Sequence, residues 1–291
     1  MEWFNRLRAR NASALVWLLV LNIGVWLAVK IVGVGFSLFG IDEYNWLKYL
    51  EMPASWTIWQ RQPWTLLTYM FLHSEFFHLF FNMLCLYWFG RMFLDRFTQK
   101  QLVGLYILGG IAGAAAYMGA YHLFPVFSTK IFGSYLLGAS ASIMAIILAI
   151  TMTEPNYSIR LFLIGDIKLK YIGIVTVVLI LLSVNGENAG GEWAHLGGVA
   201  MGILYAWAWK KGVDLALIIN KPIDLVVTLF RKPKKKTKRA DFRRQPKTDA
   251  EYNQSKASDE AEIDRILDKI KRSGYQSLTE KERNFLFKQK K

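Results

Sequence analysis

Long apolar blocks separated by short polar segments fill the first 210 residues of the chain. A helix needs about 20 predominantly apolar residues to cross the hydrocarbon core of a bilayer, and most of these blocks approach that length. We therefore predict an all-α fold, a polytopic membrane bundle of six helices. The predicted spans cover residues 13–31, 78–96, 102–124, 135–152, 171–185 and 193–210.

Two of the connecting segments carry a mixed pattern. Val32–Phe77 is long and rich in aromatic residues. Its tryptophans are Trp46, Trp56, Trp59 and Trp64. Because tryptophan favours the membrane–water boundary, we expect this segment to be a loop along the membrane surface. Ile159–Gly165, after the fourth span, is apolar but too short to cross, which favours a re-entrant or interfacial piece.

Beyond the sixth span the hydrophobic pattern changes. Residues 1–212 are predicted to form the membrane domain, and 213–230 an interfacial segment, since charges and Pro222 interrupt its apolar residues. Residues 231–260 are basic and nearly without apolar anchors, which predicts a disordered linker. Residues 261–291 are predicted to form a helical hairpin. Its signals are apolar residues at helical spacing, a glycine stop and a capping box: Ile263, Ile266, Leu267, Ile270, Gly274, Thr279 and Glu282.

The net charge of the chain is +14, and its basic residues are unevenly placed. Lysine and arginine gather before the first span, after the second, after the fourth and after the sixth. Cytoplasmic loops carry such an excess, so we expect both ends of the chain on the cytoplasmic side. The run Arg231–Arg239 adjoins the predicted spans, which favours contact with anionic membrane lipid over nucleic acid. No nucleic-acid partner is expected, and a single cysteine, Cys85, excludes a disulfide within the chain.

Polar side chains are costly inside membrane spans, so each one requires a reason. His78 and Asn82 lie near the start of the second span, Ser140 near the start of the fourth and His195 near the start of the sixth; His73 directly precedes the second span. Even-numbered spans begin on the same side, and a helix rises 1.5 Å per residue. These groups are therefore predicted to lie within about 10 Å of the outer boundary.

This gathering suits nucleophilic catalysis. A serine hydroxyl is a weak nucleophile and needs a base, which His195 could provide to Ser140. His78 and Asn82 are spaced i, i+4 and share a helix face, from which both could donate hydrogen bonds to an oxyanion. Because no Asp or Glu lies within the fourth or sixth predicted span, we expect a Ser–His dyad. Glu192, just outside the sixth span, is a weak candidate for a third member.

Other interpretations of the same residues remain open. A serine within a span usually bonds to a helix backbone, the interpretation we apply to Ser142 and Ser183. A zinc site formed by His73, His78 and His195 is a second alternative, although the sequence contains no HExxH pair. We expect no metal and no cofactor. The glycines of the third span are taken to permit close packing: Gly109, Gly110, Gly113 and Gly119.

Three motifs together resemble those of the rhomboid family of intramembrane serine proteases. The segment from His73 through His78 to Asn82 resembles the family's histidine–histidine–asparagine motif. Gly138-Ala-Ser-Ala141 resembles its GxSG nucleophile motif, and Ala194-His-Leu-Gly-Gly198 its last-span histidine motif. The similarity covers about residues 10–212 in order, which implies a six-helix rhomboid-like bundle.

The resemblance also implies roles for individual residues. Ser140 would be the nucleophile and His195 the general base. His78, Asn82 and the backbone amide of Ser140 would line the oxyanion hole. His73 would sit at the mouth of the site, Gly138 would permit close approach, and Gly198 with Gly202 would form a packing pair.

The sequence departs from the family pattern at three positions. Ala141 follows the nucleophile where a glycine is usual, Thr65 follows Trp64 in place of an arginine, and Met144 stands where some members carry a tyrosine. The resemblance implies an endopeptidase that cleaves transmembrane segments, in single-span or other membrane proteins, near the extracytoplasmic face. A rival is an inactive relative that only binds membrane proteins. The tail resembles that of some bacterial members, which implies a bacterial cytoplasmic membrane.

Overall fold

The computed structural model of the protein describes residues 14–40, 46–161, 165–186, 188–230 and 249–288. The chain divides into two compact units, Met1–Arg231 and Lys232–Lys291.

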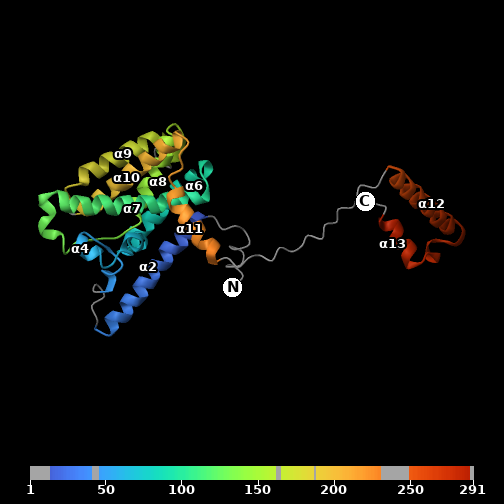
Figure 1. Cartoon of the computed structure of the whole chain (residues 1–291), viewed down its shortest axis with the longest axis horizontal. Helices are drawn as coiled ribbons and strands as arrows, with labels where there is room; N and C mark the ends of the chain where they lie inside the picture. The colour runs from blue at the N-terminus through green and yellow to red at the C-terminus, as the bar shows by residue number, and fades with distance from the viewer. Residues whose placement is uncertain (1–13, 41–45, 162–164, 187, 231–248, 289–291) are drawn as a thin grey trace. The chain divides into compact units, whose positions relative to one another are not determined.

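Six of the helices described in the first unit correspond to the six predicted spans, so the predicted all-α class is confirmed. They are α2 (Ala14–Leu38), α6 (Phe76–Arg96), α7 (Gln99–Leu123), α8 (Ser140–Thr153), α9 (Leu169–Ser183) and α10 (Ala189–Lys210). Among the described residues, α2, α6 and α7 are long and apolar enough to cross a membrane, while α8 and α9 are shorter apolar helices. Figure 1 shows α7, α8 and α10 together in the bundle, where they pack on one another more extensively than any other helices.

Three predicted span boundaries are wrong, and each error has a local cause. The first helix runs to Leu38, because its apolar sequence continues through glycines that the helix tolerates. The fourth helix begins at Ser140 and not at residue 135, because Gly138 adopts φ +128°, which no helix contains. The sixth begins at Ala189 and not at residue 193, with Asn188 at its N-cap. The glycines and Glu192 that weaken the apolar pattern there lie inside its first turn.

The segment between α2 and α6 folds into short elements. These are β1 (Met52–Pro53), α4 (Trp56–Trp59), α5 (Thr65–Thr68) and the 3-10 turn η1 (Tyr69–Phe71). β1 pairs antiparallel with β2 (Tyr135–Leu136), and residues 137–139 connect β2 to the start of α8. The segment thus holds the strand from which the chain enters α8.

Side-chain hydrogen bonds fix this segment internally. The Trp64 indole N–H donates to the Tyr49 carbonyl over 2.7 Å, and the Thr68 hydroxyl donates to the Leu50 carbonyl over 2.6 Å. Thr65 is buried, and its hydroxyl donates to the Gln62 carbonyl over 2.8 Å. A threonine at this position therefore satisfies its polar atom locally.

After α8 the chain forms a hairpin and not a re-entrant piece. Strands β3 (Ser158–Leu161) and β4 (Gly165–Lys168) pair antiparallel, with Ile159 opposite Ile167. The pairing satisfies backbone groups that an isolated apolar segment would leave without partners in lipid. The sequence did not indicate the partner strand, because β4 contains Asp166 and Lys168 and has no apolar pattern.

Helix α8 lies against α7 at glycines. A β-carbon added to Gly109 would lie 2.6 Å from the Ala145 β-carbon, and one added to Gly113 would lie 2.5 Å from the Ala141 β-carbon. Real β-carbons essentially never approach so closely. Around Gly119, by contrast, nothing lies within 4 Å. The predicted packing role is therefore wrong for Gly119, while Gly109 and Gly113 do permit close approach.

Helix α10 meets the same two alanines from another side. A β-carbon on Gly198 would collide with the Ala141 carbonyl oxygen, and one on Gly202 would collide with that of Ala145. Small residues let helix backbones approach closely, and dispersion between them holds membrane helices together. The pair Gly198 and Gly202 therefore packs α10 against α8, as the resemblance implied.

A fourteen-residue helix, α11 (Leu217–Phe230), follows α10 and contains Pro222. The Asn220 side-chain amide donates to the Lys100 carbonyl over 2.9 Å, and the Lys100 ammonium lies 2.6 Å from the Asp224 carboxylate. These bonds attach α11 to the start of α7. The predicted interfacial segment is thus a helix, with Leu225 and Leu229 among its exposed apolar side chains.

The second unit contains α12 (Asp249–Ser273), the 3-10 turn η3 (Tyr275–Ser277) and α13 (Glu280–Lys288). Helix α12 begins before the predicted residue 261, so the linker prediction is wrong for 249–260. The first part of that linker, 231–248, lies outside the described residues. The predicted capping box is present: the Thr279 N–H donates to Glu282 over 2.8 Å. That bond, with the nearby Lys269 ammonium, lowers the pKa of the Glu282 carboxyl to about 2.

The glycine packing predicts a stability difference between two alanine substitutions in α7. Gly113→Ala should lower the free energy of unfolding by about 1–3 kcal/mol, because the added methyl overpacks the contact with Ala141. Gly119→Ala should be neutral or stabilising, because its methyl enters open space. Thermal unfolding in detergent would compare the two variants with the wild type.

A double variant tests the named contact. Ala141→Gly added to Gly113→Ala removes the colliding methyl and should restore part of the lost stability, with the Ala194 carbonyl still 3.1 Å away. Equal losses in Gly113→Ala and Gly119→Ala would contradict this packing account.

Candidate active site

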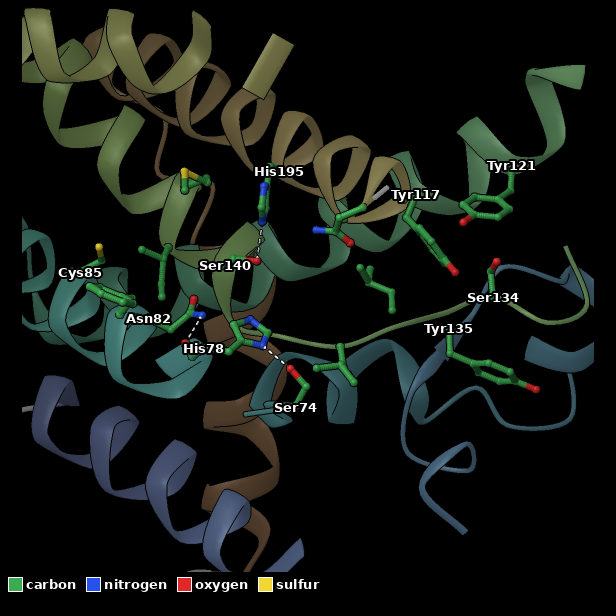
Figure 2. Close-up of a pocket in the computed structure, with 18 of the residues that line it drawn as sticks. Ser74, His78, Asn82, Cys85, Tyr117, Tyr121, Ser134, Tyr135, Ser140 and His195 are labelled. Atoms are coloured by element: carbon green, nitrogen blue, oxygen red, sulfur yellow. Dashed lines mark hydrogen bonds between the residues drawn. The ribbon is translucent and has the colours of Figure 1, made fainter. Parts of the chain in front are cut away.

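Ser140 and His195 come together from different helices. Ser140 is the first residue of α8, and His195 lies in the second turn of α10. The Ser140 hydroxyl lies 2.7 Å from His195 Nε2. Figure 2 shows the imidazole aimed at the hydroxyl. This is the hydrogen bond that a nucleophile shares with its general base.

The second ring nitrogen of His195 contacts a carboxylate. His195 Nδ1 lies 3.1 Å from Glu192 Oε2, one turn earlier in α10. The predicted sixth span contains no acidic residue, but α10 starts before that span and includes Glu192. The spacing i, i+3 was the signal that could have found this pair, since it places both side chains on one helix face.

His78 and Asn82 both lie in the first two turns of α6. His78 Nδ1 lies 3.1 Å from the Ser74 hydroxyl, which leaves Nε2 free to face Gly138. The Asn82 amide nitrogen donates to the His78 carbonyl over 2.8 Å. The structure therefore brings these two residues to the same end of the bundle as Ser140 and His195, as Figure 2 shows.

Gly138 gives the His78 ring access to Ser140. A β-carbon on Gly138 would lie 3.1 Å from His78 Nε2 and 3.7 Å from the Ser140 hydroxyl oxygen. Its φ of +128° also disfavours any other residue. Gly138 thus keeps open the space between the hydroxyl and a hydrogen-bond donor.

The position of Ser140 at a helix start adds further donors. The first four N–H groups of a helix lack intrahelical acceptors, and the N-terminus carries a partial positive charge. Ser140, Ala141 and Ser142 occupy these positions in α8. Charge developing on an oxygen near Ser140 would be stabilised by this end of the helix.

His73 does not lie at the mouth of the site. It is buried, and its ring stands edge-on to that of His78 with centroids 5.1 Å apart. It lines a separate cavity of about 90 Å³, together with the buried Glu51. Burial lowers the pKa of His73 to about 4 and raises that of Glu51 to about 7. His73 is therefore a neutral imidazole that packs against the His78 ring.

Ser140, His195, His78 and Asn82 line one large cavity. Its volume is about 780 Å³, and polar side chains from α6, α7 and α8 face it alongside apolar ones. Figure 2 draws its lining. Among the lining residues are Ser74, His78, Asn82, Cys85, Tyr117, Tyr121, Tyr135, Ser140, Met144, Asn188 and His195. Met144, at the position where some members of the family carry a tyrosine, lines this cavity. Cys85 lines it as well, which its apolar surroundings in the sequence did not indicate.

The histidines do not converge as metal ligands. Across the described residues, no three His, Cys, Asp or Glu side chains are grouped so that they could hold a metal ion. The nitrogens of His195 face Ser140 and Glu192, and one nitrogen of His78 faces Ser74. The three-histidine zinc alternative therefore has no ligand set in this part of the chain.

Comparison with known proteins identifies two matching family models. The model described as the Rhomboid domain matches residues 60–211, more than half of the chain. A model described as a family of unknown function matches residues 247–288, which include all of α12 and all of α13.

Two curated proteins are similar to the chain. The mitochondrial RHOMBOID-like protein 12 of Arabidopsis thaliana is 29% identical over 154 residues, 50% of this chain and 45% of that protein. The mitochondrial Rhomboid protein 1 of Saccharomyces cerevisiae is 24% identical over 204 residues, 65% of this chain and 54% of that protein. The chain spans about half the length of these relatives.

The geometry predicts which serine reacts with a fluorophosphonate. Ser140 should be labelled, because its hydroxyl is bonded to His195 and faces the large cavity. Ser142, two residues later, is buried and should stay unlabelled. Mass spectrometry of the labelled peptide would locate the adduct. Ser142→Ala should retain labelling and Ser140→Ala should lose it; the reverse pattern would move the nucleophile.

Proposed function

The chain belongs to the rhomboid family of membrane proteins, and from that premise we propose that it is an intramembrane serine endopeptidase. Its substrates would be single-span or other membrane proteins, cut in their transmembrane segments. The observation that carries the proposal is the 2.7 Å contact between the Ser140 hydroxyl and His195 Nε2 on the wall of a cavity.

In the proposed reaction, the Ser140 oxygen attacks the carbonyl carbon of the scissile peptide while His195 accepts the hydroxyl proton. The resulting tetrahedral intermediate collapses, the C–N bond breaks, and His195 gives its proton to the departing amine. The amino-terminal part of the substrate remains as an ester on Ser140. Water, deprotonated by His195, then hydrolyses that ester and restores the hydroxyl.

The oxyanion of each tetrahedral intermediate needs donors. We assign this role to His78, Asn82 and the backbone N–H of Ser140. The approach of His78 Nε2 to Gly138 supports the first assignment, and the start of α8 supports the third. Asn82 is bonded to the His78 carbonyl, so it would act through its second amide hydrogen or by holding the turn.

The depth of the site follows from the helix starts. His78 is the third residue of α6, Ser140 the first of α8 and His195 the seventh of α10. At 1.5 Å per residue, all three lie within about 10 Å of the helix ends. Arg96 and Lys210 end α6 and α10 at the opposite side, which supports an extracytoplasmic site by the positive-inside rule. Water reaches such a depth without crossing the bilayer.

We further propose a multi-pass protein of a bacterial cytoplasmic membrane with both chain ends in the cytoplasm. The charge distribution supports the orientation. The bacterial assignment rests on the resemblance of the tail, whereas both curated relatives carry mitochondrial names. Arg231–Arg239 would contact anionic lipid on the same side.

The alternative function is that of an inactive relative that binds membrane proteins. Such a protein has no need of a nucleophile paired with a base. The contact between Ser140 and His195 favours the protease. Ala141, where the family usually has a glycine, is also compatible with a protease. Its methyl group occupies space that Gly113 leaves open in α7, so it does not displace Ser140.

Cleavage of a purified single-span substrate tests this proposal. The wild type should cut, and Ser140→Ala and His195→Ala should reduce the rate by at least about 10³-fold, because the residues act as a unit. His122→Ala is the matched control: this histidine is exposed and bonds to the Met118 carbonyl within α7. Wild-type protein that binds the substrate without cutting would favour the inactive relative.

The cut should fall in the outer third of the substrate span or just outside it. The scissile bond must leave its helix before attack, so glycine or proline downstream should accelerate cleavage. Mass spectrometry of the products would locate the bond. Cuts clustered at the cytoplasmic end would contradict the proposed orientation.

The second unit is proposed to be dispensable for chemistry. Ser140, His195 and the cavity all lie in the first unit, so removal of residues 232–291 should change kcat by less than about threefold. The assay would use the same substrate in detergent, with folding checked by thermal unfolding. A folded truncation without activity would show that the tail takes part.

A further inference from the structure

Glu192 is placed where a third member of the catalytic group would stand. Its carboxylate oxygen Oε2 lies 3.1 Å from His195 Nδ1, while His195 Nε2 faces Ser140 at 2.7 Å. The Glu192 and His195 side chains are 17% and 18% exposed, so solvent screens their interaction only partly. Both belong to α10, which fixes their separation.

We propose that Glu192 is a positioning residue, which makes the site a Ser140–His195–Glu192 triad. This inference rests on the proposed protease function and adds a residue to it. The carboxylate accepts a hydrogen bond from His195 Nδ1–H. That bond selects the tautomer in which Nε2 carries the lone pair that Ser140 requires. When His195 takes the serine proton, the carboxylate stabilises the imidazolium.

The surroundings of Glu192 suit this role. It lies in the first turn of α10, where the helix dipole favours a negative charge. It does not line the large cavity, so a change at Glu192 alters the imidazole without altering the surface that substrate touches. Removal of its charge should therefore change kcat and leave KM nearly unchanged.

The contact with Glu192 should make the pH dependence of kcat/KM sensitive to this carboxylate. Other titratable groups near His195 could contribute to the same dependence. The titratable residues that line the same cavity are His78 and Cys85 from α6, Tyr117 and Tyr121 from α7, and Tyr135 from β2. The hydrogen bonds of His195 go to Ser140 and Glu192 and to none of these residues. A protonated His78 would disfavour a second positive charge on His195. The Glu192 carboxylate is thus the group in contact that favours the imidazolium.

The test is Glu192→Gln, which keeps the shape of the side chain and removes its charge. We expect kcat to fall by about 10- to 10³-fold with KM within about threefold. The acid limb of the kcat/KM profile should move to lower pH, because without the carboxylate a more acidic solution is needed to protonate the base. A residue that only supported the fold would leave this limb in place.

Glu154→Gln is the matched control. Glu154 is the C-cap of α8, at the opposite end of that helix from Ser140, where its carboxylate lies 2.9 Å from Arg96, so the variant removes the same charge away from His195. It should leave kcat and the acid limb unchanged. If Glu192→Gln matches the wild type in rate and in pH profile, Glu192 has no positioning role. If the wild type neither cleaves substrate nor labels at Ser140, the proposed protease function itself fails.

Nitrogen-15 NMR of labelled histidines covers the case in which Glu192→Gln unfolds. With His195→Ala used to assign the signal, the wild-type resonance should show protonation at Nδ1 in the neutral ring. A neutral ring protonated at Nε2 would overturn the inference regardless of the stability of any variant.

Discussion

Close packing of α8 between α7 and α10 is the constraint on which the site depends. Ala141 lies against Gly113 of α7 on one side and against Gly198 of α10 on the other. Dispersion and close backbone approach hold membrane helices together, since lipid tails offer no hydrophobic advantage to burial. A methyl group at either glycine would move α8 by a few tenths of an ångström or more. Ser140 directly precedes Ala141, and His195 precedes Gly198 by three residues, so the same contact sets the distance between hydroxyl and imidazole.

The entry of the chain into α8 depends on a second set of contacts. β1 holds β2, and Gly138 turns the chain with a positive φ before the helix begins at Ser140. The Gly138 N–H donates to the Tyr69 carbonyl over 3.0 Å, which ties this turn to the segment that precedes α6. The positions of His78 and Ser140 relative to each other therefore depend on the β1–β2 pairing and on the Gly138–Tyr69 hydrogen bond. Neither His78 nor Ser140 takes part in these contacts. His78, Ser140 and His195 lie near the starts of their helices. Backbone N–H groups without intrahelical acceptors, and water, can stabilise a negative charge there.

The sequence predicts the six helices because most of the apolar blocks approach the length that a helix needs to cross a bilayer. It also predicts the meeting of Ser140, His195, His78 and Asn82, because helices that alternate in direction return polar residues to one end. It does not predict that Glu192 contacts His195. The glycines that precede Glu192 weaken the apolar pattern, so the start of α10 at Ala189 is hidden. Likewise, the β3–β4 hairpin depends on a pairing between strands of which one is polar, and His73 is buried by contacts that come from tertiary structure.

The proposed reaction passes through one intermediate that no binding protein would form, an ester between Ser140 and the amino-terminal part of the substrate. Rapid acid quenching of the wild type with a single-span substrate, followed by peptide mass spectrometry, would detect it. If Ser140 is the nucleophile, the peptide that contains Ser140 gains the mass of that substrate fragment, and His195→Ala does not accumulate the adduct. Substrate cleaved without any adduct on Ser140, or with the adduct on another residue, would contradict the assignment of the nucleophile.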